Sequence, residues 1–365
     1  MKLVIATPLY PPEIGGPATY SQLLSEELPS RNITVELVKF GEVRQLPKVL
    51  RHLAYFWKVF KVARRSDVVF ALDPVSTGLP ALLAARCARK PFIVKIVGDY
   101  AWEQGQQRFG ITKTLDDFIL TKQVPFIVHL LRKIQSFVAR NAARIIVPSE
   151  YLKGIVSSWD MPHRDIDVIY NAVHYENAGT VPKSVARLPR PLVVSAGRLV
   201  PWKGMEGVIE AVALLRERGM EASLAIVGDG PDRIALVARA ENKLGADYVF
   251  TGELSHADTL ATVGSADVFV LNSTYEGLSH LLIEAVMLGT PIVATRVGGN
   301  PEVVTHKKQG LLVESSNTPE LSEALYHMLT DAKLRSHVNA RARESAKRFS
   351  VETMLDAVVS VIRNV

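Results

Sequence analysis

The chain has one cysteine, Cys87, among its 365 residues. A single thiol excludes a disulfide framework and a zinc site built from cysteines. Long apolar runs are missing as well, because none reaches the roughly 18 residues that a membrane-spanning helix needs. The N-terminal Lys2–Ala6 stretch runs into a proline-rich loop rather than a signal-peptide cleavage site. The 23 glycines and 20 prolines follow no repeat. We therefore expect a cytosolic globular protein.

Positive charge is concentrated in the first half of the chain. Residues 1–171 carry 23 Lys and Arg against 15 Asp and Glu, whereas residues 172–365 carry 20 against 22. A basic half suits nucleic acid, an anionic membrane surface or an anionic small ligand, and it also fits simple solvated lysines. The hydrophobic fraction of 48% supports sizeable cores and excludes disorder. At roughly 150 residues per domain, the length predicts two domains.

Short runs rich in Val and Ile alternate with helical stretches in both halves, which predicts an α/β fold with parallel, doubly wound sheets. In the first half we expect strands at Lys2–Ala6, Thr34–Phe40, Asp67–Leu72, Pro91–Val97 and Arg144–Val147, and a helix at Pro17–Leu28. In the second half we expect strands at Leu192–Ala196, Ser223–Val227, Tyr248–Thr251, Val268–Leu271, Ile292–Ala294 and Leu311–Val313. The expected helices there are Gly207–Arg218, Asp232–Leu244, Leu281–Leu288, Glu320–Thr330 and Val351–Ile362.

The domain boundaries follow from this pattern. We expect an N-terminal domain at 1–174, a polar linker at 175–189 that lacks apolar periodicity, and a second domain at 190–350. Ligands of open parallel sheets bind outside the carboxyl ends of the strands. Two such domains in tandem therefore predict a binding cleft between them.

Glycines follow several of the expected strands. Gly15 and Gly16 lie between the first strand and a helix, where a backbone can come close to an anion. This loop is not a Gly-x-Gly-x-x-Gly fingerprint, so a nicotinamide cofactor is disfavoured. Gly228-Asp229-Gly230 forms a second turn, in which Asp229 fits a structural role better than a chemical one. Val297–Glu302 is a third, at least as compatible with plain chain reversal as with ligand contact.

Two cations and two acids carry the chemistry of the second half. Arg198 and Lys203 follow its first strand and are able to hold a diphosphate, although their spacing fits two solvated cations equally well. Glu276 lies in the loop before a helix that we expect to start near Ser279, and Glu284 lies within that helix. The two acids can accept hydrogen bonds from two sets of sugar hydroxyls. Glu284 is flanked by apolar residues and needs a partner, because an unpaired buried charge is costly.

Together these motifs resemble the retaining glycosyltransferases of family 4. The family has the GT-B fold, in which two Rossmann-like doubly wound parallel-sheet domains face each other across a cleft. The resemblance covers nearly the whole chain, and Asn171-Ala-Val is similar to the family's Asn-Gly-Val at the end of the first domain. It rests on the ordered set Gly15-Gly16, Gly197-Arg198, Lys203-Gly204, Gly228-Asp229-Gly230 and Glu276 to Glu284.

The resemblance implies a role for each motif. Arg198 and Lys203 bind the donor diphosphate and stabilise the leaving group, while Glu284 accepts hydrogen bonds from the ribose. Glu276 holds the donor sugar together with the backbone of Gly277, Leu278 and Ser279. Gly15 and Gly16 approach the phosphate from the first domain, and helix 351–365 crosses back onto that domain. The base lies against Gly228, Asp229 and Gly230 and against Gly252, Glu253 and Leu254. The nucleotide sugar is a substrate, and no cofactor or divalent metal is implied.

One departure from the family concerns the acceptor side. Many relatives place a histidine after the fourth strand of the first domain, where this chain reads Val97-Gly-Asp-Tyr-Ala-Trp-Glu103. Asp99 is the nearest candidate for an acceptor-side polar group. We favour a front-face substitution in which the departing phosphate takes the acceptor's proton, so that Asp99 positions the acceptor rather than acting as an obligatory base. The sequence does not give the sugar, for which Ser279, His280 and Asn300 are the expected readers.

The segment Gln45–Arg65 combines a broad apolar face with six Lys and Arg and no acid. Such a helix suits an anionic membrane interface, and it suits a core-packing helix with a solvated cationic back about as well. The basic half favours an anionic acceptor or a membrane carrier, so we expect a saccharide or polyprenyl-linked acceptor. A peripheral location on the cytoplasmic membrane face is compatible with this expectation. No nucleic-acid partner is expected, because no recognition motif or stacking platform is present.

Three other functions compete with a glycosyltransferase. A nucleotide-sugar 2-epimerase shares the two-domain pattern but needs a hydrolase-like acid/base set that Arg198, Lys203, Glu276 and Glu284 fit poorly. A phosphorylase needs a lysine that binds pyridoxal phosphate, and no motif points to one. A non-catalytic nucleotide-sugar or nucleic-acid binding module is the alternative outside enzymes; it would bind ligand without donor hydrolysis.

Overall fold

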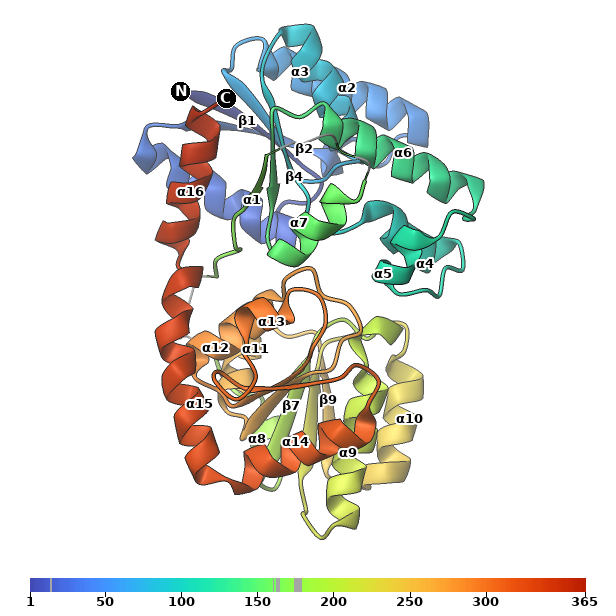
Figure 1. The fold of residues 1–365 in the computed structure, drawn as a ribbon, viewed down its shortest axis with the longest axis vertical. Helices are drawn as coiled ribbons and strands as arrows, with labels where there is room; N and C mark the ends of the chain where they lie inside the picture. Colours follow the sequence, from blue (N-terminus) through green and yellow to red (C-terminus); the bar gives the residue numbers. More distant parts are fainter. Residues whose placement is uncertain (14, 160, 162–164, 174–178) are drawn as a thin grey trace. The chain divides into compact units, whose positions relative to one another are not determined.

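The computed structural model describes residues 1–13, 15–159, 161, 165–173 and 179–365 (Figure 1). The chain divides into two compact units. The N-terminal unit contains residues 1–171 and 352–365, and the C-terminal unit contains residues 172–351. The predicted boundary at 174 and residues 175–178 of the predicted linker lie outside the described residues. The rest of that linker belongs to the C-terminal unit and includes the short helix α8 (Lys183–Ala186).

The N-terminal unit is built on a six-stranded sheet with the order β2-β1-β3-β4-β5-β6. All of its strand pairs are parallel. The strands are β1 (Lys2–Thr7), β2 (Thr34–Lys39), β3 (Val68–Ala71), β4 (Phe92–Lys95), β5 (Arg144–Val147) and β6 (Ile166–Val168). The helices are α1 (Gly16–Glu27), α2 (Lys48–Ala63), α3 (Gly78–Ala88), α4 (Tyr100–Arg108), α5 (Leu115–Leu120), α6 (Phe126–Arg140), α7 (Glu150–Ser157) and α16 (Val351–Arg363).

The C-terminal unit repeats this plan with the strand order β12-β11-β10-β7-β8-β9, again parallel throughout. Its strands are β7 (Leu192–Ala196), β8 (Ser223–Val227), β9 (Tyr248–Gly252), β10 (Val268–Leu271), β11 (Ile292–Thr295) and β12 (Leu311–Val313). Besides α8, its helices are α9 (Met205–Glu217), α10 (Arg233–Leu244), α11 (His256–Gly264), α12 (His280–Leu288), α13 (Asn300–Val303), α14 (Thr318–Thr330) and α15 (Ala332–Ser345).

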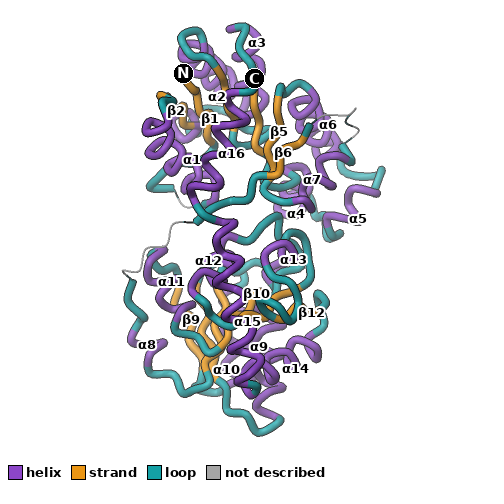
Figure 2. The backbone as a smooth tube through the Cα atoms, turned by 60° about the vertical axis from the view of Figure 1, so that its left-hand side comes forward, coloured by secondary structure: helices purple, strands orange, loops and turns teal. Residues whose placement is uncertain are grey.

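The predicted fold class is confirmed, since both units are doubly wound parallel sheets with helices on both sides (Figure 2). All eleven expected strands form, and α12 starts where expected, with the Ser279 hydroxyl accepting a hydrogen bond from the Leu282 amide. The prediction missed β6 and several helices, among them α3. Helix α3 is apolar on most of its surface, so it lacks the one-sided pattern by which a surface helix is recognised.

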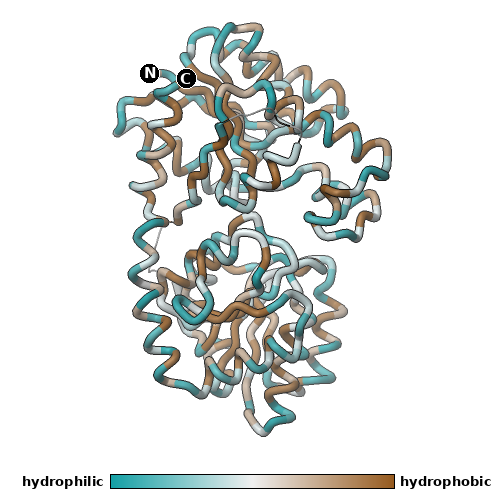
Figure 3. The backbone as a smooth tube through the Cα atoms, viewed as in Figure 1, coloured by the Kyte–Doolittle hydropathy of each residue, from teal (hydrophilic) through white to brown (hydrophobic). Residues whose placement is uncertain are grey.

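The strands form the apolar centre of each unit (Figure 3). β3 and β10 are buried at every position, as expected for strands covered by helices on both faces. Helix α16 packs on the N-terminal unit, where Arg363 donates to the Arg31 carbonyl at 3.1 Å. Among the described residues, every helix is too short or too polar to cross a bilayer.

Each sheet has a point at which the strand order reverses. The strands that come next in the sequence after the first strand lie on one side of it, and all later strands lie on its other side. In the N-terminal unit this point lies between β1 and β3, and in the C-terminal unit it lies between β7 and β10. The loops that leave the two central strands there must diverge, which opens a crevice at the carboxyl edge of the sheet. The predicted Gly15-Gly16 loop and the predicted Arg198–Lys203 loop both start at such a point.

Candidate active site

The C-terminal unit brings two predicted motifs together at its reversal point. Val270 of β10 pairs with Ser195 of β7, so the chain leaves both strands side by side. β7 continues into Gly197 and a short 3-10 helix at Pro201–Lys203, and β10 continues into Asn272 and the loop before α12. The cationic loop and the acidic loop are therefore neighbours, although about 70 residues separate them in the sequence.

Lys203 and Glu276 form an ion pair at this edge. Lys203 Nζ lies 2.5 Å from Glu276 Oε1, and the same oxygen accepts a hydrogen bond from the Ser273 hydroxyl at 2.7 Å. Glu276 is only 8% exposed, whereas Arg198 is exposed. Low exposure strengthens the attraction between the two charges, because little water screens it. The pair fixes a cation and a carboxylate within reach of one bound ligand.

Backbone contacts hold these loops close together. Gly204 adopts a left-handed conformation with φ of +63°, and a Cβ there would lie 2.1 Å from the Asn272 carbonyl oxygen. The Asn272 side chain donates from Nδ2 to the Gly204 carbonyl at 2.8 Å, and the Thr274 backbone amide donates to the Trp202 carbonyl at 2.8 Å. Only glycine at position 204 allows this approach, so the position of Lys203 depends on it.

A further glycine turn supports the Glu276 loop from the other side. A Cβ on Gly298, whose φ is +53°, would lie 1.8 Å from the Glu276 carbonyl oxygen. The Gly299 amide donates to that same carbonyl at 3.0 Å. The sequence left two roles open for Val297–Glu302, chain reversal and ligand contact. In the structure this segment supports the loop that carries Glu276. Gly298 is a residue that sequence reasoning did not single out.

The second acid of the pair lies on α12 with a partner. Glu284 is buried, and its Oε1 lies 2.7 Å from Nε2 of His256 on α11. The expectation that a carboxylate in so apolar a helix needs a partner is thus met. Sequence reasoning missed both His256 and Ser273, the hydroxyl next to Glu276. No local signal distinguishes Ser273, because its place beside β7 follows from the strand order of the sheet.

The Gly228–Gly230 turn lies against the first loop of the unit. A Cβ on Gly228 would be 2.1 Å from the Gly197 carbonyl oxygen, and the Gly228 amide donates to the Gly252 carbonyl at 2.9 Å. The Asp229 carboxylate accepts from the Gly230 amide at 2.7 Å and pairs with Arg233 at 3.3 Å. These contacts fit the turn role expected for Asp229. Glu253 and Leu254 follow directly after Gly252.

In the N-terminal unit, Gly15 and Gly16 form the start of α1. The Gly15 carbonyl accepts from the amides of Ala18 and Thr19 at 2.9 and 3.2 Å, which begins the helix. Gly16 is exposed, so its backbone is accessible to a ligand. The glycine loop and the Arg198–Lys203 loop lie in different units, and their joint contact with one phosphate stays a prediction.

Lys95 is a buried cation at the carboxyl end of β4 that sequence reasoning missed. Its Nζ donates to Asn171 Oδ1 at 2.8 Å and lies 3.7 Å from the centre of the Tyr20 ring. The side chain is 2% exposed, and this burial lowers the pKa of Lys95 to about 7. Asn171, which carries part of the family resemblance, is therefore the anchor of a buried amine.

Asp99 is also buried, at 2% exposure, and caps α4. Its carboxylate accepts from the Trp102 amide at 2.9 Å, from Gln135 Nε2 at 2.9 Å and from Trp159 Nε1 at 3.1 Å. Burial raises the pKa of the Asp99 carboxyl in spite of these donors. Its hydrogen bonds go to the protein, so any role in positioning the acceptor stays a prediction. Nearby on α4, burial and the charge of Asp99 raise the pKa of Glu103 to about 7.

Two family models match this chain. Residues 4–172 match a glycosyl transferase 4-like domain, and residues 180–345 match the glycosyl transferases group 1 domain. The two matches cover the two units separately, and the second includes every candidate residue from Arg198 to Glu284. The chain belongs to the group 1 glycosyltransferases. This membership confirms the family expected from the motifs.

Two curated relatives of the transferase match different shares of the chain. It is 30% identical to the 2-deoxystreptamine glucosyltransferase of Streptomyces kanamyceticus over 234 residues, which is 61% of this chain. That match spans only 60% of the relative's own length. It is 25% identical to the N-acetyl-alpha-D-glucosaminyl L-malate synthase of Bacillus anthracis, with 100% of this chain and 98% of the relative covered.

The fold of the transferase is similar to that of solved glycosyltransferases. The crystal structure of Anabaena Alr3699/HepE in complex with UDP superposes with a TM-score of 0.77 at 19% identity, covering 100% of both chains. Sucrose-phosphate synthase from Thermosynechococcus elongatus also gives a TM-score of 0.77. Within the described part of the chain, no three His, Cys, Asp or Glu side chains are grouped so as to hold a metal ion.

Proposed function

We propose that this transferase moves a hexosyl group from a UDP- or GDP-sugar to a saccharide or lipid-linked acceptor, with retention of anomeric configuration. The observation that carries this proposal is the Lys203–Glu276 pair at the β7/β10 reversal point. A cation beside a carboxylate meets the two needs of a nucleotide-sugar donor, since one stabilises phosphate charge and the other accepts hydrogen bonds from sugar hydroxyls. Fixed by the Gly204 and Gly298 backbone contacts, the pair is organised before the donor binds.

The proposed reaction is a substitution on one face of the sugar. The acceptor oxygen forms a bond to the anomeric carbon as the bond from that carbon to the phosphate oxygen breaks. The departing phosphate takes the acceptor's proton, so charge and atoms balance without a separate protein base. Lys203 and Arg198 stabilise the negative charge that grows on the diphosphate, which is the usual work of a divalent metal. We therefore propose a reaction that needs no metal ion and no cofactor.

The remaining predicted residues surround that reaction. Glu284, held by His256, receives the ribose hydroxyls, and the turn of Gly228–Gly230 with Gly252 forms the base side of the donor site. The amides at the start of α12, after Gly277 and Leu278, face the site with the partial positive charge of a helix N-terminus. Ser279 uses its hydroxyl to cap that helix.

A panel of UDP, GDP, ADP and their sugars tests the donor class. We expect the nucleotides with one of the three bases to raise the melting temperature of the protein. A ligand present at about 100 times its Kd adds about 2.7 kcal/mol to the free energy of unfolding. For a unit of this size that corresponds to roughly 5–10 °C. The measurement is differential scanning fluorimetry of the full chain, with and without a chelator.

The control for this panel is the Lys203→Ala variant, in which the shift by the preferred nucleotide should shrink while the other nucleotides stay ineffective. A shift that requires added Mg²⁺ would contradict metal independence, and absence of any shift would contradict the donor proposal as a whole. Release of free sugar from the bound donor separates a transferase from a binding module.

We also propose that the transferase binds an anionic membrane surface through Gln45–Arg65. In α2 only Tyr55, Val59 and Ala63 are buried, so the apolar face expected from the sequence is not used for the core. Val49 is 72% and Trp57 is 56% exposed. Two of the six cations are paired, Lys58 with Glu42 and Arg65 with Glu36, which reduces the charge available to lipid.

Replacing Leu53 and Trp57 with Glu should abolish binding to vesicles that contain anionic lipid, because both side chains are exposed on the apolar face of α2. Binding of the unmodified protein should weaken as salt is added, since the Debye length shortens. Co-sedimentation at several salt concentrations measures both effects. Ile234→Glu, which alters an apolar residue that is 85% exposed on α10, is the matched control and should bind as wild type. Equal binding of all variants would contradict the α2 interface.

A further inference from the structure

The N-terminal unit contains a pocket of about 820 Å³ that the donor chemistry does not use. Most of its lining residues come from α5, from α6 and from the residues that directly follow α7. The inner wall includes Asp99, Gln135 and Trp159, in which Gln135 and Trp159 both donate hydrogen bonds to the Asp99 carboxylate. Gln135 is fixed further, because its Oε1 accepts from the Ala101 amide at 3.0 Å. These hydrogen bonds give the polar groups of the wall partners within the protein, so the pocket is a built feature of the unit.

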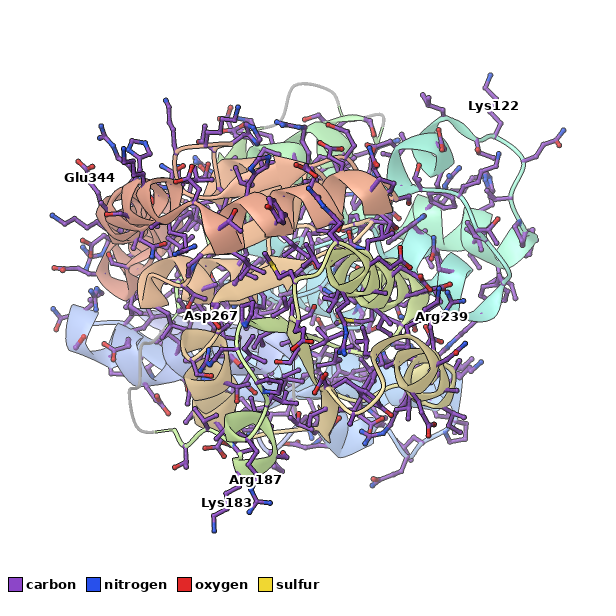
Figure 4. The ribbon with its side chains drawn as sticks, turned by 90° about the horizontal axis from the view of Figure 1, so that it is seen from below. Lys122, Lys183, Arg187, Arg239, Asp267 and Glu344 are labelled. Atoms are coloured by element: carbon purple, nitrogen blue, oxygen red, sulfur yellow. The ribbon has the colours of Figure 1, made fainter. Side chains whose placement is uncertain are left out.

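Cations line the outer part of the pocket. Lys122, Arg132, Lys133 and Arg140 all contribute, and among the described lining residues Asp99 is the acid that opposes them. Lys122 and Lys133 are exposed and form no ion pair with any described residue. Figure 4 shows the Lys122 side chain extending away from the ribbon. Unpaired cations at the mouth of a pocket favour an anionic ligand.

Arg132 is held in place by the protein itself. Its guanidinium donates to the Thr121 carbonyl at 2.7 Å and to the Phe118 carbonyl, and it lies 3.7 Å from the centre of the Phe118 ring. These contacts fix the end of α5 against α6. These contacts hold the Arg132 guanidinium in one orientation, in which it presents a positive charge to the pocket. The ammonium group of a lysine is a point charge on a flexible stem and would be held less firmly.

Apolar side chains supply the rest of the walls and continue outside. Phe118, Ile119, Phe137 and Trp159 line the pocket. Leu120, the last residue of α5, is 82% exposed, and Phe126, the first residue of α6, is 80% exposed. A large apolar side chain that remains in water beside a cationic pocket fits a ligand, or a surface, with both an anionic and a hydrocarbon part.

We propose that this pocket binds the phosphate group of a lipid phosphate, with the hydrocarbon chain leaving along Leu120 and Phe126. The charge of the rim selects the phosphate, and the aromatic walls receive the first part of the chain. The idea that this pocket receives the acceptor rests on the proposed transferase function. Binding of a lipid phosphate does not rest on it, because the pocket lies wholly within the N-terminal unit.

The test is calorimetric titration of the full chain with decyl phosphate below its micelle concentration. Decyl phosphate should bind at least tenfold more tightly than inorganic phosphate, decanol or glucose 1-phosphate. Lys122→Ala with Lys133→Ala should weaken binding by roughly tenfold, as expected for the loss of two phosphate contacts. Ser136→Trp, which fills the pocket without changing its charge, should abolish binding.

Lys333→Ala with Lys347→Ala is the matched control, because it removes two exposed lysines from the C-terminal unit. It should bind decyl phosphate as wild type does. Equal affinity for inorganic phosphate and decyl phosphate, or unchanged binding in the Lys122/Lys133 variant, would overturn the proposal. If glucose 1-phosphate bound more tightly than decyl phosphate, the proposed lipid ligand would be wrong and a soluble sugar phosphate would be indicated.

The nucleotide-induced melting shift separates this proposal from the transferase function. Protein that binds UDP or GDP but not decyl phosphate refutes the pocket alone. Protein that binds decyl phosphate but no nucleotide refutes the transferase proposal and leaves the lipid phosphate site standing. The Ser136→Trp variant should retain the nucleotide shift, which shows that its loss of lipid phosphate binding is local.

Discussion

Replacing Lys203 with alanine should lower kcat for sugar transfer by roughly 10²–10³-fold, equivalent to about 2.7–4 kcal/mol of transition-state stabilisation. The reason is that charge develops on the leaving diphosphate during the reaction, and Lys203 is a little-exposed cation fixed at 2.5 Å from Glu276. Steady-state kinetics with the donor identified by the nucleotide panel measures the effect.

Two controls separate chemistry from folding in this experiment. Lys243→Ala breaks a comparable ion pair, with Glu210 at 3.2 Å, on an exposed helix face away from the predicted residues, and it should keep full activity. Glu276→Gln and the Lys203→Ala/Glu276→Gln double variant complete a cycle, in which contacting partners are expected to be non-additive by about 0.5–3 kcal/mol. Purely additive losses would contradict the idea that the two side chains act as a pair.

Replacing Gly298 with alanine should destabilise the C-terminal unit by about 3–5 kcal/mol. Its left-handed φ of +53° accounts for about 1–2 kcal/mol of this in any residue with a Cβ. The remainder comes from the Cβ itself, which would lie 1.8 Å from the Glu276 carbonyl oxygen and must push that loop away. Nucleotide binding should weaken with it, because Glu276 and the start of α12 move together. Calorimetric unfolding and nucleotide titration measure the two effects.

Gly219→Ala is the matched control for Gly298→Ala. Gly219 also has a left-handed φ, +86°, but nothing lies within 4 Å of the place where its Cβ would be. Gly219→Ala should therefore lower the free energy of unfolding only by the roughly 1–2 kcal/mol that a left-handed φ costs, and it should leave nucleotide binding unchanged. If both variants lose the same stability, the contact with Glu276 is not what position 298 supplies.

Much of the fold was predictable from local pattern. Leu192–Ala196, for example, is a short apolar run between Pro191 and Gly197, a pattern typical of a strand covered on both faces. Helix α12 was predictable because Ser279 is a good cap residue before an apolar run. Helix α3 and strand β6 were missed, since α3 is apolar almost all round and β6 is only three residues long.

The candidate site was predictable only in part. The residue types and their order pointed to Arg198, Lys203, Glu276 and Glu284, but not to their partners. Ser273 and His256 became visible only in the structure, as did the contact of Gly298 with Glu276. For Asp99 the structure adds only its surroundings: it is buried and accepts hydrogen bonds from Gln135 and Trp159, while its expected role on the acceptor side stays a prediction.

By itself, the sequence determined the two parallel sheets and the family, and it predicted which loops carry the chemistry, because all of these depend on short-range pattern. The tertiary structure alone decided which loops meet. Lys203 and Glu276 are neighbours because β10 is added next to β7, and no local signal records that order. The single cysteine and the absence of long apolar runs excluded whole classes of protein. Only the tertiary structure showed which faces of the basic helices α2 and α6 the core leaves exposed.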